Sequence, residues 1–339
     1  MKNDSSAVLA CTGAVIGAGF ASGKEIVVFF SRYGKHAGWL IVVAAVVMAE
    51  LCWVCMRTAV SSGSSCWCEK TYGSKLAPIC FLLLMFVNAG AMVSASGHMA
   101  ALIWQHQWAY PIGAVGTLMV SWRIGSGRLK PLTLLSAFLT MALLCAMLAA
   151  LAAQPQHMLL VGSSEIALGN LTGASVRAVG YAAMNMTLAI GVAWKSALNT
   201  KRIAKVSALF GWLVGILLLI GHYVYRQHPE VYTSEFPMVA LLAGYGRKGY
   251  LFSVVLLYLA VFTTLTSVLY TIRTAVKART KRWSVQVLFT LGLPMLLSCL
   301  GFSQIIERFY APAGLVCLLY VFLPMARNGL HSIRTTTFS

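Results

Sequence analysis

The sequence predicts an all-α protein that spans a membrane ten times, and three observations lead to this prediction. Hydrophobic residues make up 59% of the 339 residues and charged residues only 10%, whereas a soluble domain carries about 25% charged residues. The apolar residues occur in runs of about twenty, the length of helix that crosses a bilayer core. The basic residues gather in short clusters between these runs, as in the cytoplasmic loops of membrane proteins. This composition excludes a soluble multi-domain protein.

Ten runs are candidate spans, and the chain 1–339 is expected to form one integral membrane domain. The fourth run is the shortest and is opened by Pro111. No cleavable targeting segment is expected, because the N-terminal stretch carries Lys2 against Asp4 and its apolar run is interrupted by glycines. The longest connection, 154–173, is expected to lie over the mouth of the protein. The predicted spans are 7–33, 37–57, 76–103, 109–122, 131–153, 174–198, 203–225, 249–273, 284–302 and 309–326.

The net charge of +18 could indicate nucleic acid as a partner. The basic clusters, such as Arg279, Lys281 and Arg282, lie between spans, and no nucleic-acid motif accompanies them. The expected partner is therefore the lipid bilayer of the plasma (inner) membrane, with no nucleic acid.

The distribution of Lys and Arg predicts the orientation. With both termini cytoplasmic, most of the 26 Lys and Arg fall in cytoplasmic segments, as the positive-inside rule requires. Eight fall elsewhere: Lys24, Arg32, Lys35, Arg177, Arg226, Arg247, Lys248 and Arg308. Because a missed or added span would scramble this alternation, the asymmetry supports ten spans.

The nine cysteines predict neither a disulfide framework nor a zinc site. Seven lie in apolar runs, where a free thiol behaves as a small hydrophobe. Cys66 and Cys68 lie in a polar loop, and no second Cys/His pair at zinc-site spacing accompanies them. Inert thiols and no resident cofactor are expected.

Two of the spans carry helix-breaking residues. The first has Gly13, Gly17, Gly19 and Gly23 within eleven residues, which is costly in a helix. The sixth has polar residues near its middle, followed by a glycine: Asn185, Thr187 and Gly191.

As first and sixth of ten, these spans hold matching places in two halves of five, 7–153 and 174–326, whose membrane orientations must be opposite. Matched breaks of this kind indicate an inverted-repeat transporter with its site at the bilayer midplane. The alternative is that the glycines only allow close helix packing.

The expected break suggests what the site would bind. Unwinding at Gly17–Gly23 (Gly17, Ala18, Gly19, Phe20, Ala21, Ser22 and Gly23) frees backbone N–H groups that suit a substrate carboxylate. The half-helix before it ends in free carbonyls near Gly13 to Ile16, which suit a cation. The neutral side chains of Asn88, Asn185 and Thr187 either bind polar groups of the substrate or bond helix to helix.

The first span carries a family resemblance. Gly17-Ala-Gly-Phe-Ala-Ser-Gly23, then Lys-Glu-Ile and the pair Phe29-Phe30, resembles YkvI-type membrane proteins. These are classed with the amino-acid permeases of the amino acid–polyamine–organocation superfamily, which has the LeuT-type fold. Glu235-Phe-Pro and Tyr310-x-Pro-x-Gly314 also match, and span number and spacing agree over nearly the whole chain. The family usually has Gln where this chain has Lys24.

The resemblance also implies a sodium site. LeuT-type transporters bind Na⁺ between carbonyls of the first helix and an Ala-x-x-(Ser/Thr)-(Ser/Thr) motif on the eighth. The matching residues here are Gly13, Ile16, Ala260, Thr263 and Thr264; oxygen ligands suit such an ion. Alternatively, the hydroxyls bond back to their own helix. Proton-coupled members can replace the ion with a Lys on the fifth helix. The fifth span here has no charge, which favours Na⁺ over H⁺.

Three ionisable residues lie within spans, where charges are costly and usually functional: Lys24, Glu25 and Glu50. Glu25 either couples transport to an ion or only stabilises a helix start. Lys24 is the more informative of the two, because a positive charge is unfavourable in the first turn of a helix. Glu50 either forms a structural ion pair or carries a proton.

These observations predict a secondary active symporter for an amino acid or similar small zwitterion, coupled to Na⁺ or H⁺ and working by alternating access. The alternatives are a proton-coupled permease and a non-transporting sensor or receptor on the same scaffold. An enzyme is not expected, since no paired catalytic carboxylates or nucleophile with a base is visible, and no ATP-binding motif indicates a pump. The sequence leaves open the substrate, the direction of transport and the oligomeric state.

Overall fold

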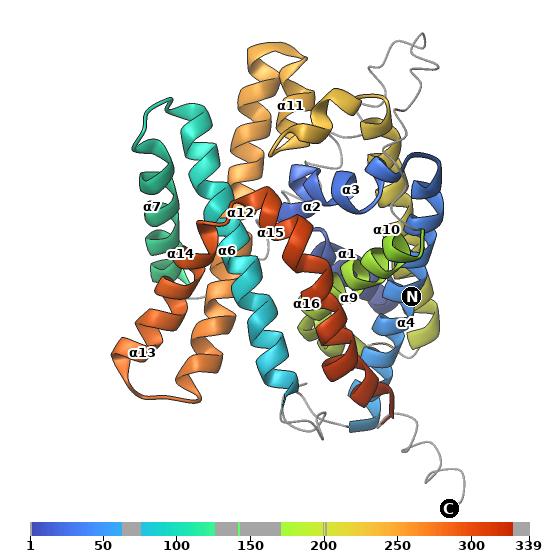
Figure 1. Ribbon diagram of the computed structural model, residues 1–339. Coiled ribbons are helices and arrows are strands. Elements are labelled where there is room, and N and C mark those ends of the chain that lie inside the picture. The colour runs from blue at the N-terminus through green and yellow to red at the C-terminus, as the bar shows by residue number, and fades with distance from the viewer. Residues whose placement is uncertain are drawn as a thin grey trace, which may run out of the picture.

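The structure, a computed structural model, describes residues 2–62, 76–125, 142, 171–198, 200 and 202–327. All regular elements in these ranges are helical, as predicted, and several long helices, such as α4, α6 and α12, run between an upper and a lower end of the molecule (Figure 1).

Six helices of the described chain are long and apolar enough to cross a membrane. They correspond to the second, third, sixth, seventh, eighth and tenth predicted spans. A shorter apolar helix, Trp283–Ser298, corresponds to the ninth. The six are Ser31–Ser62, which contains α4 (Ala37–Ser62); α6 (Ala77–Ile103); α9 (Leu171–Ala197); α10 (Ile203–Arg226); α12 (Gly246–Lys277); and Phe302–Arg327.

The first predicted span is broken, as expected. It consists of α1 (Lys2–Val15), α2 (Ala18–Ser22) and α3 (Lys24–Phe29). Gly23, between α2 and α3, has φ of 78°, in the left-handed region that glycine reaches without strain. The short 3₁₀ helix η1 (Ser31–His36) then leads into α4.

The predicted break in the sixth span is wrong, because α9 is continuous from Leu171 to Ala197. The Asn185 side chain donates to the carbonyl of Tyr181 at 3.2 Å, and the Thr187 hydroxyl donates to that of Ala183 at 2.7 Å. Both bonds run four residues back along the helix, so these polar groups are satisfied without unwinding it. The inverted repeat was predicted from two matching breaks, and only the break in the first span is present.

The fourth predicted span is α7 (Ala109–Ile124). The fifth, 131–153, lies outside the described residues apart from Ala142. So does most of the connection 154–173, and so do the polar-loop cysteines Cys66 and Cys68.

The last two spans differ from prediction in their boundaries and in their regularity. The ninth consists of α13 (Trp283–Val287), the π-helix η3 (Leu288–Gly292) and α14 (Leu293–Ser298). The tenth begins at Phe302 and not at 309, because Gly301, with φ of 86°, turns the chain there. Within it, α15 (Phe302–Ile305), η4 (Ile306–Tyr310), α16 (Ala311–Cys317) and η5 (Leu318–Phe322) alternate between α- and π-helix.

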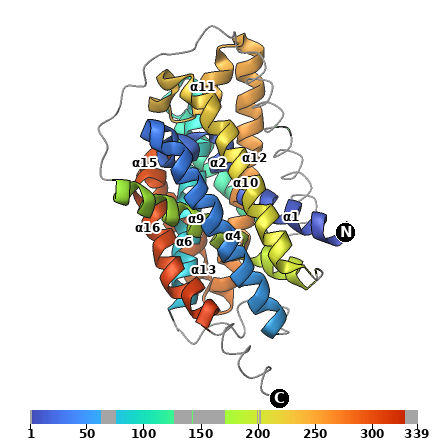
Figure 2. The same ribbon diagram turned by 90° about the vertical axis from the view of Figure 1, so that its right-hand side faces the viewer.

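Several helix ends lie at opposite ends of the molecule. The end of α4, the start of α6 and the turn from α12 to α13 lie at the lower end, and the turn from α6 to α7 lies at the upper end (Figure 1). Also at the upper end, the 3₁₀ helix η2 (Pro229–Thr233) and α11 (Pro237–Ala243) connect α10 to α12 (Figure 2).

Large apolar side chains cover much of the outer surface. Tryptophans are among them, including Trp39, Trp108, Trp212 and Trp283, each 59–67% exposed. A surface of this kind is expected of a protein whose outer face contacts lipid.

Candidate functional site

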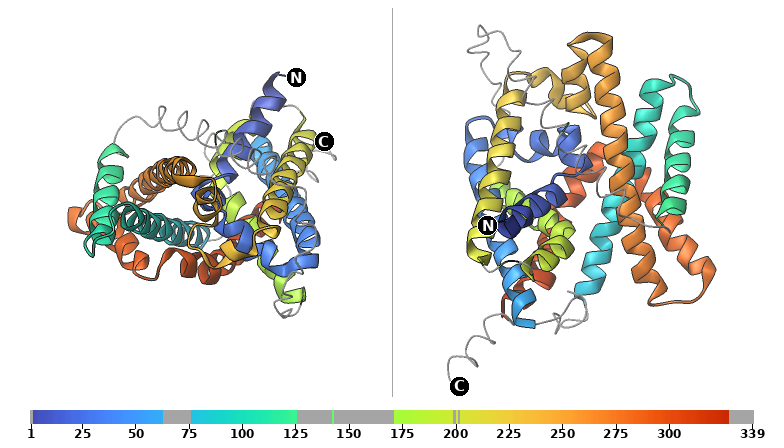
Figure 3. Two further views of the ribbon diagram at one scale, coloured as in Figure 1. Left: turned by 90° about the horizontal axis from the view of Figure 1, so that it is seen from above. Right: turned by 180° about the vertical axis from the view of Figure 1, so that it is seen from behind.

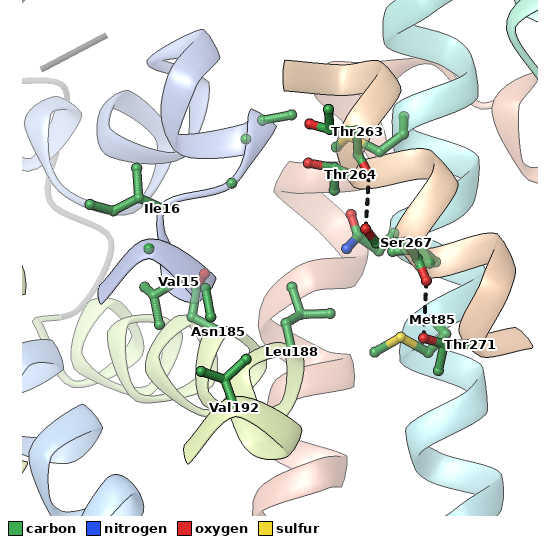
Figure 4. A pocket seen from close by; sticks show the side chains of 18 of the residues that line it. Val15, Ile16, Met85, Asn185, Leu188, Val192, Thr263, Thr264, Ser267 and Thr271 are labelled. Carbon is green, nitrogen blue, oxygen red and sulfur yellow. Dashed lines mark hydrogen bonds between the residues drawn. The ribbon is translucent and has the colours of Figure 1, made fainter. Parts of the chain in front are cut away.

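A cavity of about 430 Å³ lies beside the break in the first span (Figure 4). Its walls come from α1 and α2, α6, α9 and α12, together with Glu25 on α3 and Tyr310 at the end of η4. Figure 3 shows from behind how α1 and α9 lie side by side; α1 packs on α9, and α12 packs on α6 and contacts α2. The cavity therefore lies between the first, third, sixth and eighth predicted spans.

Glycines allow the close contacts at the break. A β-carbon on Gly19 would collide with the Glu25 carboxyl, and one on Gly23 would collide with the Tyr225 hydroxyl. The Ser22 hydroxyl donates to the Gly19 carbonyl at 2.7 Å and accepts from the Lys24 backbone N–H at 3.1 Å. The break is thus closed by its own residues and by α10.

Glu25 points into the cavity. It is 5% exposed and lines the cavity beside Gly17, Ala18 and Gly19. The Tyr181 hydroxyl on α9 hydrogen-bonds to its carboxyl.

The Tyr181 ring is held by the two phenylalanines at the end of α3. The centroid of the Phe29 ring lies 4.9 Å from that of Tyr181, and the Phe30 centroid lies 5.2 Å from it. The paired phenylalanines therefore position the group that holds Glu25.

Lys24 points away from the cavity. It is 4% exposed, and its Nζ donates to the carbonyl of Ser234, between η2 and α11, at 2.9 Å. The carboxylates of Glu307 and Glu235 attract its charge, and Arg32 repels it. Lys24 thus ties the first span to the upper connection between α10 and α12, although its neighbour in the chain reaches the cavity.

Of the three neutral polar candidates, two reach the cavity. Asn88 and Asn185 line it, and the Tyr310 hydroxyl donates to Oδ1 of Asn88 at 3.2 Å. Thr187 is fully buried and does not line the cavity; it contacts Cys317 on α16.

The candidate cation ligands face one another across the cavity. Gly13 lines it from α1 and Ile16 from the link that follows α1, and Thr263 and Thr264 line it from α12, whereas Ala260 does not line it. The Thr263 hydroxyl donates to the Ala260 carbonyl at 3.0 Å, which is the back-bonding alternative.

The hydroxyls of Ser267 and Thr271 continue this row along α12, each 3.0 Å from the carbonyl four residues earlier (Figure 4).

The remaining candidates lie elsewhere. Phe20, Ala21, Ser22 and Gly23 are buried in the break but do not line the cavity. Glu50 is on an exposed face of α4, so the structure does not bring it to the site. No group of three or more His, Cys, Asp or Glu in the described ranges is arranged to hold a metal ion.

Several important residues were not found from the sequence. Tyr181 was not singled out, and Tyr310 was noted only as part of a motif, because the groups that bond to their hydroxyls are far away in the chain. The apolar wall of the cavity was not assigned residue by residue; it includes Phe81, Met85, Met92, Leu188 and Val192. Spacing along α12 could have found Ser267 and Thr271, since they follow Thr263 at intervals of four residues.

Comparison with known proteins supports the resemblance in the first span. The chain is 23% identical over 330 residues to a protein of Bacillus subtilis (strain 168) described as the uncharacterized membrane protein YkvI, and the match covers 91% of each chain. The similarity thus extends far beyond the first span. No protein family model matches the chain.

Proposed function

Taking the chain as a relative of YkvI-type membrane proteins, we propose that it is a secondary active transporter of an amino acid or similar small zwitterion. The observation that carries the proposal is the cavity at the break of the first span, which is lined by backbone, amide, hydroxyl and carboxyl groups together with apolar side chains. Small-solute sites have this mixed lining. No catalytic role is proposed for any residue.

Transport would proceed by alternating access around this cavity. The substrate's polar groups lie near Gly17, Gly19 and Asn185, and its side chain lies against the apolar residues of α6 and α9. The moving part is formed by the first, second, sixth and seventh spans, which rock against the others. The LeuT-type arrangement with two five-span repeats belongs to this proposal.

The proposed coupling ion is Na⁺. Gly13 and Ile16 on one wall, and Thr263 and Thr264 on the other, offer the hard oxygen atoms that an alkali ion prefers. The Ala260 carbonyl completes the proposed set. Proton coupling is the second candidate, and the buried carboxyl of Glu25 in the cavity is the observation that favours it.

Uptake into proteoliposomes tests the proposal. Labelled amino acids are expected to accumulate when a Na⁺ gradient is imposed and to equilibrate without one. Accumulation driven only by a proton gradient would select the second candidate. Binding without flux would indicate a sensor or receptor, and no gradient-driven flux across a broad amino-acid panel would contradict the proposal.

A threonine substitution tests the ion site. Thr263→Ala removes one proposed ligand and is expected to abolish the stimulation of uptake or binding by Na⁺. Thr274→Ala is the matched control, because Thr274 lies on the same helix, bonds back to Tyr270 at 2.8 Å, and is outside the cavity. If Thr263→Ala keeps the full Na⁺ effect, the ion site is wrong.

A further inference from the structure

We propose that the Glu25 carboxylate binds the ammonium group of the transported solute, so that the substrates are small primary amines, zwitterionic or cationic, with an apolar body. This inference rests on the proposed transport function and names its substrate class.

The first argument is the charge of the cavity. Of the described residues that line it, Glu25 is the single acidic one, and none is Lys, Arg or His. A cavity lined in this way attracts a cationic group and repels an unaccompanied anion.

The second argument is that Glu25 has no cationic partner within the described chain. The neighbouring Lys24 donates to the Ser234 carbonyl, and Arg32 pairs with Glu307 at 3.9 Å. The Tyr181 hydroxyl, which is a neutral group, supplies a side-chain hydrogen bond to Glu25. A buried carboxylate is costly unless a charge of opposite sign accompanies it, and an ammonium group entering the cavity would provide that charge.

The third argument is where the carboxyl lies. It rests against Gly19, in the place that a β-carbon would occupy. This is the part of the break where the sequence predicted a substrate carboxylate. The helix behind it, α2, has only five residues, so its dipole offers an anion little stabilisation. Glu25 therefore makes the break suitable for a cation.

The fourth argument is the apolar part of the lining. Phe81, Met85, Met92, Leu188 and Val192 supply an apolar surface within a cavity of about 430 Å³. Methionine side chains adapt to ligands of different shape. A solute with an ammonium group at Glu25 would place an apolar side chain there.

Matched ligands with one carbon skeleton test the inference. Leucine carries both charged groups, 3-methylbutylamine only the ammonium group, and 4-methylpentanoate only the carboxylate. Binding to purified protein is measured by thermal shift, together with the corresponding sets for alanine, methionine and phenylalanine. A ligand of the folded state raises the melting temperature. Ligands with an ammonium group are expected to bind, and the carboxylates are not.

Two variants then locate the effect. Glu25→Gln is expected to weaken binding of the amines at least about thirtyfold, as for loss of one partner of a buried charge pair. Its control is Glu230→Gln, at an exposed residue of η2. Gly19→Ala displaces the carboxyl and is expected to weaken binding without removing the charge. Its control is Gly38→Ala, where a β-carbon meets open space.

Three results would overturn the inference. These are binding of the carboxylates as strong as that of the amines, retention of amine binding in a folded Glu25→Gln protein, and no binding by any amine in the sets. Retained binding with loss of proton-driven uptake would assign Glu25 to proton coupling instead. These experiments measure binding and not flux. A protein that binds amines without transporting them would therefore contradict the proposed transport function but not the inference about Glu25.

Discussion

At the scale of single residues, Lys24 and Glu25 are adjacent in the chain but serve different surroundings. Glu25 faces the cavity, whereas the Lys24 ammonium group donates to Ser234 in the connection between α10 and α12. Both were coupling candidates because both are charged residues within a span. Sequence could not separate them, since the direction of each side chain depends on the left-handed turn at Gly23, with φ of 78°.

We predict that Lys24→Met destabilises the protein and leaves ligand binding intact. The loss of a buried hydrogen bond from a charged group should cost about 1.5–3 kcal/mol, seen as a lower melting temperature. The substrate Kd should be unchanged because Lys24 does not line the cavity. Lys248→Met, at an exposed position, is the control. An altered Kd or coupling ratio at unchanged stability would show that Lys24 takes part in coupling.

At the scale of helices, one of the two breaks was predictable and the other prediction failed. Four glycines within eleven residues break the first span, because glycine stabilises a helix poorly and two of these glycines allow contacts that a β-carbon would prevent. Asn185 and Thr187 do not break the sixth span, since each side chain bonds to a carbonyl of its own helix. A polar residue in a span therefore indicates a break less strongly than a cluster of glycines does.

The π-helical segments of the tenth span were not predictable, because they depend on packing. α16 approaches α9 so closely that a β-carbon on Gly314 would collide with the Gly180 carbonyl. A contact of this kind, between small residues, is common where membrane helices meet.

We predict that Gly314→Ala costs about 1–3 kcal/mol of stability, as insertion of a methyl group into a packed contact does. Gly191→Ala on α9 is the control, and it is expected to keep or raise the stability. A β-carbon there meets no atom within 4 Å, and alanine favours a helix by up to about 1 kcal/mol over glycine. Melting temperatures of both variants in detergent test this. Equal or higher stability of Gly314→Ala would contradict the close contact.

At the scale of the whole molecule, composition alone predicted a helical membrane protein, and the described residues confirm it with six long apolar helices. The ends of α4, α6 and α12 lie at the upper and lower ends of the molecule, whereas α1 begins near mid-height (Figure 1). The arrangement of five and five spans stays a prediction, because the fifth span lies outside the described residues and the sixth lacks its break.

We predict that the lower end faces the cytoplasm. An epitope tag inserted at 279–281, in the basic turn after α12, should be reached by antibody only after permeabilisation. A tag at 105–107, in the turn between α6 and α7, should be reached in intact spheroplasts. The reason is the excess of Lys and Arg at the lower end. If antibody reaches the tag at 279–281 in intact spheroplasts and the tag at 105–107 only after permeabilisation, the orientation is wrong. If both tags are reached from the same side of the membrane, the alternation of spans is wrong.

The link between α1 and α2 has a further consequence for how α1 can move. The two helices are joined by Ile16 and Gly17 alone, and the Gly17 N–H closes this turn on the Val15 carbonyl at 2.9 Å. Gly17 has no side chain, so its two dihedral angles reach more conformations than those of any other residue type. α1 packs on α9 and α10, whereas α2 contacts α11 and α12. A change in a few backbone angles would thus reorient one wall of the cavity as a rigid rod, with the helical hydrogen bonds on either side of the hinge kept intact.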